Sequence, residues 1–151
     1  MKISLRAQYA IEAMVYLAHL SNGNPIQSKV IAGKIGTTES YLEQIFFKLR
    51  KADLITSVRG TKGGYLIKKP LEEITVRQIL IGVDERMTLV PCVGVESTCN
   101  CKLGDICTTK KLWQKMNESV EVQTEQVTVL QLLEEYLVML RERYGEVEYY
   151  L

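Results

Sequence analysis

Residues 28–67 read SKVIAGKIGTTESYLEQIFFKLRKADLITSVRGTKGGYLI, and most of what the sequence predicts about the fold follows from them. The first part predicts two helices, over Ser28–Ile35 and Glu39–Lys51, with a short turn between them. A helix-turn-helix needs a small residue where the helices cross, a glycine able to take positive φ in the turn, and aliphatic anchors on the second helix. The residues that meet these needs, in order, are Ala32, Gly36, Leu42 and Ile45.

The end of the same stretch predicts a β-hairpin. Residues 54–58 and 65–67 alternate like short strands, and the basic, glycine-rich run RGTKGG at 59–64 joins them. A helix-turn-helix followed directly by a basic hairpin is a winged helix. A phosphate-cradling nucleotide loop is the rival interpretation of the glycines, but the run lacks the Gly-Lys-Ser/Thr ending and leads into a strand.

Polar side chains suited to DNA follow the second helix and the hairpin tip. On the helix they are Glu39, Ser40, Glu43, Gln44 and Lys48, of which the uncharged and acidic groups suit base edges, while Lys48, Arg50 and Lys51 suit phosphates. In the tip, Arg59 can enter a narrow minor groove, and glycines such as Gly60 let the backbone approach phosphates. The alternative is an αα-hairpin inside a helical core, whose polar side is merely solvated.

Charge divides the chain at Pro70. Residues 1–69 hold eleven Lys and Arg against four Asp and Glu, a balance of +7, whereas residues 70–151 hold eight against fourteen, a balance of −6. A basic first half fits a module that binds a polyanion, and an acidic second half fits a sensing or assembly module. The alternative is chance segregation of solvated charges.

Further helices are predicted over residues 5–20, 75–83 and 108–123, and a last one from a capping box at Thr128 to Tyr144. The last helix carries apolar residues three and four positions apart, at Leu130, Leu133, Leu137, Leu140 and Tyr144. This stripe favours dimerisation, with intramolecular core as the alternative. The predicted fold is therefore mainly α with a small β-hairpin wing: a winged helix-turn-helix DNA-binding domain (1–84), a cysteine-rich loop (85–107) and a helical dimerisation region (108–151).

Four cysteines, Cys92, Cys99, Cys101 and Cys107, fall within sixteen residues, and the chain has no other. Thiols gathered this tightly in a glycine-broken run favour an inorganic centre, such as an iron–sulfur cluster, over a disulfide framework. The spacing Cys-x6-Cys-x-Cys-x5-Cys lacks the paired Cys-x-x-Cys knuckles of zinc sites. Zinc and a metal-free thiol sensor are the alternatives that stay open.

Several short motifs resemble the Rrf2 family of bacterial winged-helix regulators, and most of all its iron–sulfur cluster regulators. They are Tyr9-Ala10, Ser40-Tyr41-Leu42-Glu43-Gln44, Val58-Arg59-Gly60, Gly63-Gly64-Tyr65-Leu66, and Cys101 and Cys107 ahead of Leu112-Trp113. The resemblance covers about three quarters of the chain. It implies that Ser40, Glu43 and Gln44 contact bases, and that Arg59 contacts the minor groove. It also implies that the long helix after Cys107 forms a homodimer.

The resemblance further implies a cluster held by three cysteines, Cys92, Cys101 and Cys107. The family's cluster-assembly regulators carry a histidine three residues after the last of these, where this chain has Lys110. A charged lysine is not a ligand, so the fourth ligand is either Cys99, which we slightly favour, or a carboxylate. The carboxylate candidates are Glu96, Glu43 and Glu12, the last from a partner chain.

The sequence thus predicts a cytoplasmic, homodimeric repressor that binds double-stranded operator DNA and senses an iron–sulfur cluster, [2Fe–2S] in first place and [4Fe–4S] as the alternative. It would control genes for cluster assembly. A nitric oxide or cysteine-metabolism sensor is the alternative within the family, and a small iron–sulfur electron carrier is the alternative outside it. With one histidine and no nucleophile–base pair, an enzyme is not expected, and no apolar run is long enough to cross a membrane.

Overall fold

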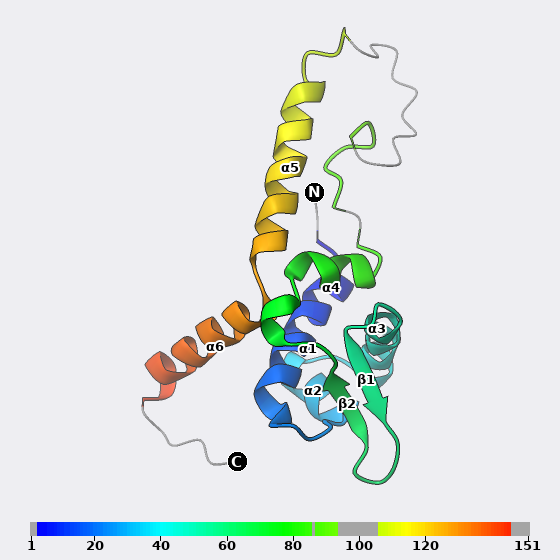
Figure 1. Cartoon of the computed structure of the whole chain (residues 1–151), viewed down its shortest axis with the longest axis vertical. Helices are drawn as coiled ribbons and strands as arrows, with labels where there is room; N and C mark the ends of the chain where they lie inside the picture. Colours follow the sequence, from blue (N-terminus) through cyan, green and yellow to red (C-terminus); the bar gives the residue numbers. More distant parts are fainter. Residues whose placement is uncertain (1–2, 86, 94–105, 146–151) are drawn as a thin grey trace.

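The computed structural model describes residues 3–85, 87–93 and 106–145 (Figure 1). It is mostly helical with one two-stranded antiparallel hairpin, which confirms the predicted fold class. The elements in chain order are α1 (Leu5–Ser21), α2 (Ser28–Ile35), α3 (Glu39–Lys51), β1 (Ile55–Val58), β2 (Gly64–Ile67), the 3-10 helix η1 (Leu71–Glu73), α4 (Val76–Gly82), α5 (Lys110–Gln126) and α6 (Val129–Tyr144). No helix in these described ranges is long and apolar enough to span a membrane.

One core holds the winged-helix elements around α1, which contacts α2, α3, α4, α6 and β2. The buried face of α1 is rich in small residues, and these let neighbouring helices approach closely. Its buried residues are Ala7, Ala10, Ala13, Met14 and Leu17. Those that α3 contributes to the same core are Leu42, Ile45, Phe46 and Leu49.

The helix-turn-helix forms as the sequence predicts. Gly36 ends α2 with φ of 72°, and the chain turns there into the residues that cap α3. The Thr38 side chain accepts a hydrogen bond from the backbone N–H of Tyr41 at 3.2 Å, which satisfies one of the free donors of the first turn. Ala32 is buried, as are Leu42 and Ile45, so each of the four predicted anchor positions is confirmed.

The hairpin pairs β1 with β2 in a register that sets Ile55 opposite Ile67 and Val58 opposite Gly64. The start of β2, next to the hairpin tip, is tied to the segment before α2, because Ile26 and Tyr65 exchange backbone hydrogen bonds at 3.0 and 2.8 Å. A Cβ atom at Gly64 would lie only 2.4 Å from the Ile26 carbonyl oxygen. The sequence suggested that the glycines of the tip serve close approach of DNA phosphates, but Gly64 is needed for the close approach of two backbones within the protein.

The capping box predicted at Thr128 is confirmed, and it lies next to a second one, at Thr75, that was not predicted from the sequence. Thr75 caps α4, Thr128 caps α6, and the two residues face each other in an isolated antiparallel bridge. Val129 is fully buried, and its N–H donates to the Ile74 carbonyl at 2.9 Å. The start of α6 is therefore part of the same core as the winged helix.

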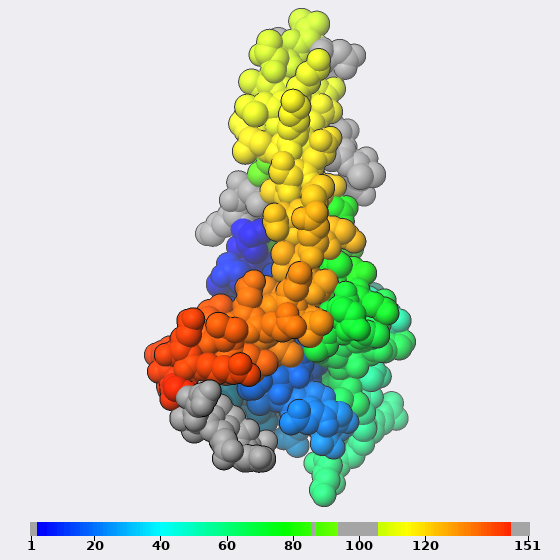
Figure 2. All heavy atoms as spheres, turned by 60° about the vertical axis from the view of Figure 1, so that its left-hand side comes forward, coloured from blue at the N-terminus to red at the C-terminus, as the bar shows by residue number. Residues whose placement is uncertain are grey.

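α5 projects from this body as a column, and α6 turns back against α1 (Figures 1 and 2). The ring of Tyr136 on α6 meets Tyr16 and His19 of α1 edge to face, at 5.4 and 5.3 Å between ring centroids. Residues 87–93 rise beside α5, away from α4 (Figure 1). The part of the chain that bears Cys92 is thus carried away from the core along α5.

Replacement of Gly64 by alanine tests the role of this residue at the start of β2. Because the new methyl group would meet backbone rather than a movable side chain, we expect Gly64→Ala to lower the free energy of unfolding by about 1–3 kcal/mol. Gly33→Ala is the matched control. Gly33 lies within α2 with nothing within 4 Å of its added Cβ, so this change should stabilise by about 0.5–1 kcal/mol. Equal unfolding midpoints for the two variants in urea would contradict the close approach.

Candidate nucleic-acid interface and cysteine segment

The side of α3 opposite its buried residues is a stripe of four exposed residues. They are Ser40, Gln44, Phe47 and Lys51, spaced four, three and four positions apart. At 3.6 residues per turn this spacing keeps them on one face of the helix. We call this set the α3 stripe. The structure therefore places two of the predicted base-reading residues, Ser40 and Gln44, on an outward face.

Glu43 lies to one side of the α3 stripe, half-buried against the wing. The Tyr65 hydroxyl donates a hydrogen bond to the Glu43 carboxylate, with 2.5 Å between the oxygens. Burial, and then this hydrogen bond, raise the pKa of Tyr65 to about 12. In this structure Glu43 ties α3 to β2. Glu39, in the first turn of α3, accepts a hydrogen bond from Ser28 at 3.0 Å.

Lys48 lies on the other side of the stripe and forms an ion pair with Asp84, just beyond α4. This hydrogen-bonded partner lowers the pKa of the Asp84 carboxyl. Tyr41 is half-buried, and its ring meets that of Tyr9 on α1 edge to face at 6.2 Å. Both predicted DNA-contacting residues therefore have an intramolecular partner that orients them.

The hairpin tip presents Arg59 and Gly60 to solvent. The Gly63 N–H donates to the Gly60 carbonyl at 2.9 Å, which closes the tip as a turn. Arg50, at the end of α3, donates to the Ser57 hydroxyl of β1 at 3.2 Å. This contact links the helix to the wing, so the two predicted DNA-contacting elements are held as one unit.

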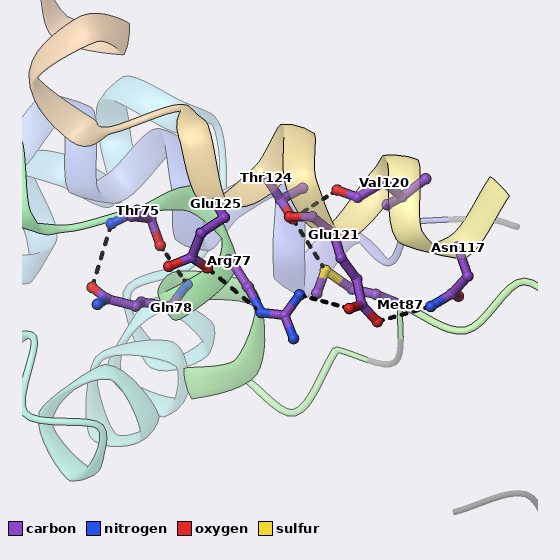
Figure 3. A network of polar contacts seen from close by, with 9 residues as sticks. All are labelled: Thr75, Arg77, Gln78, Met87, Asn117, Val120, Glu121, Thr124 and Glu125. Atoms are coloured by element: carbon purple, nitrogen blue, oxygen red, sulfur yellow. Dashed lines mark hydrogen bonds and ion pairs between the residues drawn. The ribbon is translucent and has the colours of Figure 1, made fainter. Parts of the chain in front are cut away.

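α4 connects these elements to α5. Arg77 of α4 forms ion pairs with two carboxylates of α5, Glu121 at 3.1 Å and Glu125 at 3.6 Å (Figure 3). Just beyond the other end of α4, Asp84 pairs with Lys48 of α3, and Glu85 accepts hydrogen bonds from the backbone and hydroxyl of Ser4. α4 and the residues directly after it therefore make polar contacts with both α5 and α3.

We call residues 87–107, which bear the four cysteines, the cysteine segment. Its first residues pack along α5. Asn117 of α5 is 5% exposed, accepts a hydrogen bond from the Leu89 N–H at 3.3 Å and donates to Glu121 at 2.8 Å. Lower on the same helix, the Thr124 hydroxyl lies 3.9 Å from the sulfur of Met87 (Figure 3). A buried amide whose hydrogen bonds are satisfied in this way fixes where the segment runs. It leads the chain back toward the end of α5 that follows Cys107.

Two of the four cysteines lie in the described residues. Cys92 and Cys107 are half-exposed, and the Thr109 hydroxyl lies 3.4 Å from the Cys107 sulfur. The hydrogen bond from this hydroxyl, followed by those from the backbone of Thr109 and Lys110, lowers the pKa of the Cys107 thiol. Thiolate, not thiol, is the form that binds metals. Cys99, Cys101 and the carboxylate candidate Glu96 lie outside the described residues.

Among residues 3–85, 87–93 and 106–145, no group of three or more His, Cys, Asp or Glu side chains is placed to hold a metal ion. Of the remaining carboxylate candidates, Glu12 is exposed on α1, and Glu43 is engaged by Tyr65. The described residues therefore leave the fourth ligand a prediction.

Sequence reasoning missed two features of this surface. Phe47 is exposed in the middle of the α3 stripe, although an aromatic residue in an amphipathic helix is ordinarily assigned to the core. Its spacing from Ser40 and Gln44 was the signal that could have found it. The partner of Lys48, Asp84, is thirty-six positions away in the chain, and no local pattern predicts that contact.

α3, which is the recognition helix of the helix-turn-helix, the glycine turn before it and the basic hairpin define a winged-helix DNA-binding fold. Residues 3–135 match the model of the Rrf2 family, described as an iron-dependent transcriptional regulator. The HTH-type transcriptional regulator IscR of Serratia proteamaculans is 36% identical over 133 residues, which cover 88% of this chain and 79% of that protein.

Two solved structures place the fold among regulators of the same kind. T. potens IscR superposes with a TM-score of 0.72 at 31% identity, over 90% of this chain and 88% of that one. CymR, the global cysteine regulator of B. subtilis, superposes with a TM-score of 0.74 at 27% identity, over 89% of this chain and 98% of that one. The chain belongs to the Rrf2 family of transcriptional regulators, and it is a DNA-binding regulator rather than an enzyme.

Proposed function

We propose that this regulator is a cytoplasmic homodimeric repressor whose affinity for operator DNA is set by an iron–sulfur cluster in the cysteine segment. The observation that carries the proposal is the hydrogen bond that the Leu89 N–H donates to the buried Asn117 side chain. It directs the segment that bears Cys92 back along α5, toward the end where Cys107 precedes the helix. The family description as iron-dependent and the similarity to IscR proteins support the same conclusion.

The residues present fit such a centre in their chemistry. Cys107 has a lowered pKa, and soft thiolates are the ligands that iron–sulfur centres take. Cys92, Cys101 and Cys107 would hold the cluster, with Cys99 or a carboxylate as fourth ligand. A bound cluster would supply an iron- and oxidant-sensitive link between the two ends of the segment, and [2Fe–2S] is the form we favour over [4Fe–4S]. The target genes we propose are those for cluster assembly.

A second copy of the chain would cover α5. Three of its large apolar side chains are exposed in the single chain: Leu112 at 51%, Met116 at 43% and Val122 at 54%. Most helical stability in proteins comes from packing of an apolar face, and Asn117 is the one residue of this 17-residue helix that is buried. Pairing through α5 would give the dimer two recognition helices and two wings related by twofold symmetry, which fits a pseudopalindromic operator.

On DNA we propose that Ser40, Tyr41, Glu43 and Gln44 of α3 lie at the major groove. Lys48 would contact phosphate, while Arg59 and Gly60 would contact the minor groove and its backbone. The exposure of Gln44 and Arg59 and the basic balance of residues 1–69 support this placement. Glu43 and Lys48 would have to leave Tyr65 and Asp84 to make such contacts. Their role is therefore conditional on a local rearrangement.

Gln44→Ala tests the reading of bases. A glutamine amide that bonds a base edge contributes discrimination, so we expect a loss of about 1–3 kcal/mol on the specific operator and much less on random DNA. Fluorescence anisotropy on both DNAs at one fixed salt concentration measures this. The matched control is Gln114→Ala, an exposed glutamine that lies on the opposite side of α5 from Leu112 and Met116 and should change neither affinity. Equal losses on the two DNAs for Gln44→Ala would assign this residue to the phosphate backbone instead.

The cluster itself is tested by its iron and sulfide content. Anaerobically purified protein should contain about two iron and two sulfide per chain and absorb visible light, and Cys92→Ser, Cys101→Ser and Cys107→Ser should each lose both. Cys99→Ser separates the candidates for fourth ligand, because full iron with an unchanged spectrum would assign an oxygen ligand. Zinc without sulfide, or no metal in the wild type, would refute the cluster.

A metal-free result would favour the cysteine-metabolism sensor. The specific observation behind this second candidate is the similarity to CymR, described as a global cysteine regulator, over 98% of that chain. A nitric oxide sensor is the further variant within the family, and nitric oxide would then have to alter the cluster spectrum and release the operator. The winged-helix fold argues against the alternative that the protein is an electron carrier, because a redox protein needs no exposed recognition helix.

A further inference from the structure

Phe47 is a large aromatic side chain that is 53% exposed at the centre of the α3 stripe. Its neighbours on that face, Gln44 and Lys51, are polar, and the core residue beside it, Phe46, is fully buried against Tyr65. The fold of the single chain gives Phe47 no apolar environment of that kind. Exposing an aromatic ring to water costs free energy, so its position in the middle of a recognition helix calls for a function.

Two cations flank the ring. The Cζ atom of Arg50 and the Nζ atom of Lys51 each lie 5.8 Å from the centre of the Phe47 ring. Arg50 is itself held toward the wing by its hydrogen bond to Ser57. A protein partner that covered Phe47 with an apolar surface would have to desolvate both charges, which is unfavourable without acidic partners. A polyanion such as DNA would instead pair its phosphates with the charges of Arg50 and Lys51. The Phe47 ring could then enter the groove between the phosphates.

We propose that Phe47 reads thymine by contact of its ring with the 5-methyl group in the major groove. This methyl is the one apolar group on the major-groove edges of the four ordinary bases, and phenylalanine is among the side chains that contact it. Phe47 follows Gln44 by three residues, about 4.5 Å along the helix axis, which is close to one base step of about 3.4 Å. The thymine would thus lie next to the base that Gln44 contacts.

The inference rests on the DNA-binding part of the proposed function and is independent of the cluster. It concerns specificity: ring and methyl add an apolar contact to a surface whose other members read hydrogen-bonding groups. Burying a methyl group is worth about fourfold in affinity, so two half-sites of a dimer together would gain about fifteenfold.

The experiment removes the methyl group and nothing else. An operator is first selected from a random DNA pool with the full-length protein, both with its metal centre and after removal of metal. Each thymine is then replaced in turn by deoxyuridine, and affinities are measured for the wild type, Phe47→Ala and Phe47→Leu. Val30→Ala is the matched control, because Val30 is 46% exposed on α2. Circular dichroism confirms that the variants are folded, as replacement of an exposed residue predicts.

We expect one symmetric pair of thymines at which deoxyuridine costs the wild type about fifteenfold. Phe47→Ala should lose the same factor on the thymine operator and bind both operators equally, while Phe47→Leu and Val30→Ala should keep the dependence. Tight binding without any methyl dependence, or a dependence that survives in Phe47→Ala, would overturn the inference and leave the proposed function intact. Unchanged DNA binding by Phe47→Ala combined with lost repression in transcription would overturn it in favour of a protein partner. Failure to select any operator would overturn both.

Discussion

Burial of one face of α3 against α1 fixes where every other part of the recognition surface points. Leu42, Ile45, Phe46 and Leu49 occupy the inner face of α3. Small residues along α1 give the closely packed interior that receives them. Because the core takes this face, the residues spaced at four, three and four positions on the other side must face solvent. The α3 stripe is therefore a consequence of core packing, and any change that rotates α3 would exchange its members for others.

The same packing explains how the cysteine segment could influence DNA binding. α4 lies against α1, α3 and α5, and polar contacts at or just beyond its two ends connect Arg77 with the acidic groups of α5 and Asp84 with Lys48 of α3. Exposed ion pairs of this kind contribute little stability each, so they can be exchanged at small cost. A change in the segment that moves α5 would then reach Lys48, and with it one side of the α3 stripe, without unfolding the core.

The sequence predicted those parts of the molecule that depend on neighbouring residues. Gly36 and the threonines that cap α3 and α6 act within one turn of chain, so these helix ends and the hairpin followed from local chemistry. The surroundings of Glu43 and Lys48 were not predictable, because Tyr65 and Asp84 reach them only after the hairpin and α4 fold back. The exposure of Phe47 was not predicted, because hydrophobicity alone does not separate an inward-facing from an outward-facing aromatic residue. The ligand set at Cys99 and Cys101 lies outside the described residues, and it stays a prediction of the sequence.

The central claim is that the state of the cysteine segment sets affinity for DNA in a dimeric regulator. The most direct measurement is a titration of a selected operator with the same protein preparation, before and after anaerobic removal of its metal centre, at constant salt. The account predicts that two chains bind per operator. It also predicts that removal of the centre changes affinity for this operator by at least about tenfold, while affinity for random DNA stays the same. Identical binding curves for the two states would contradict the claim.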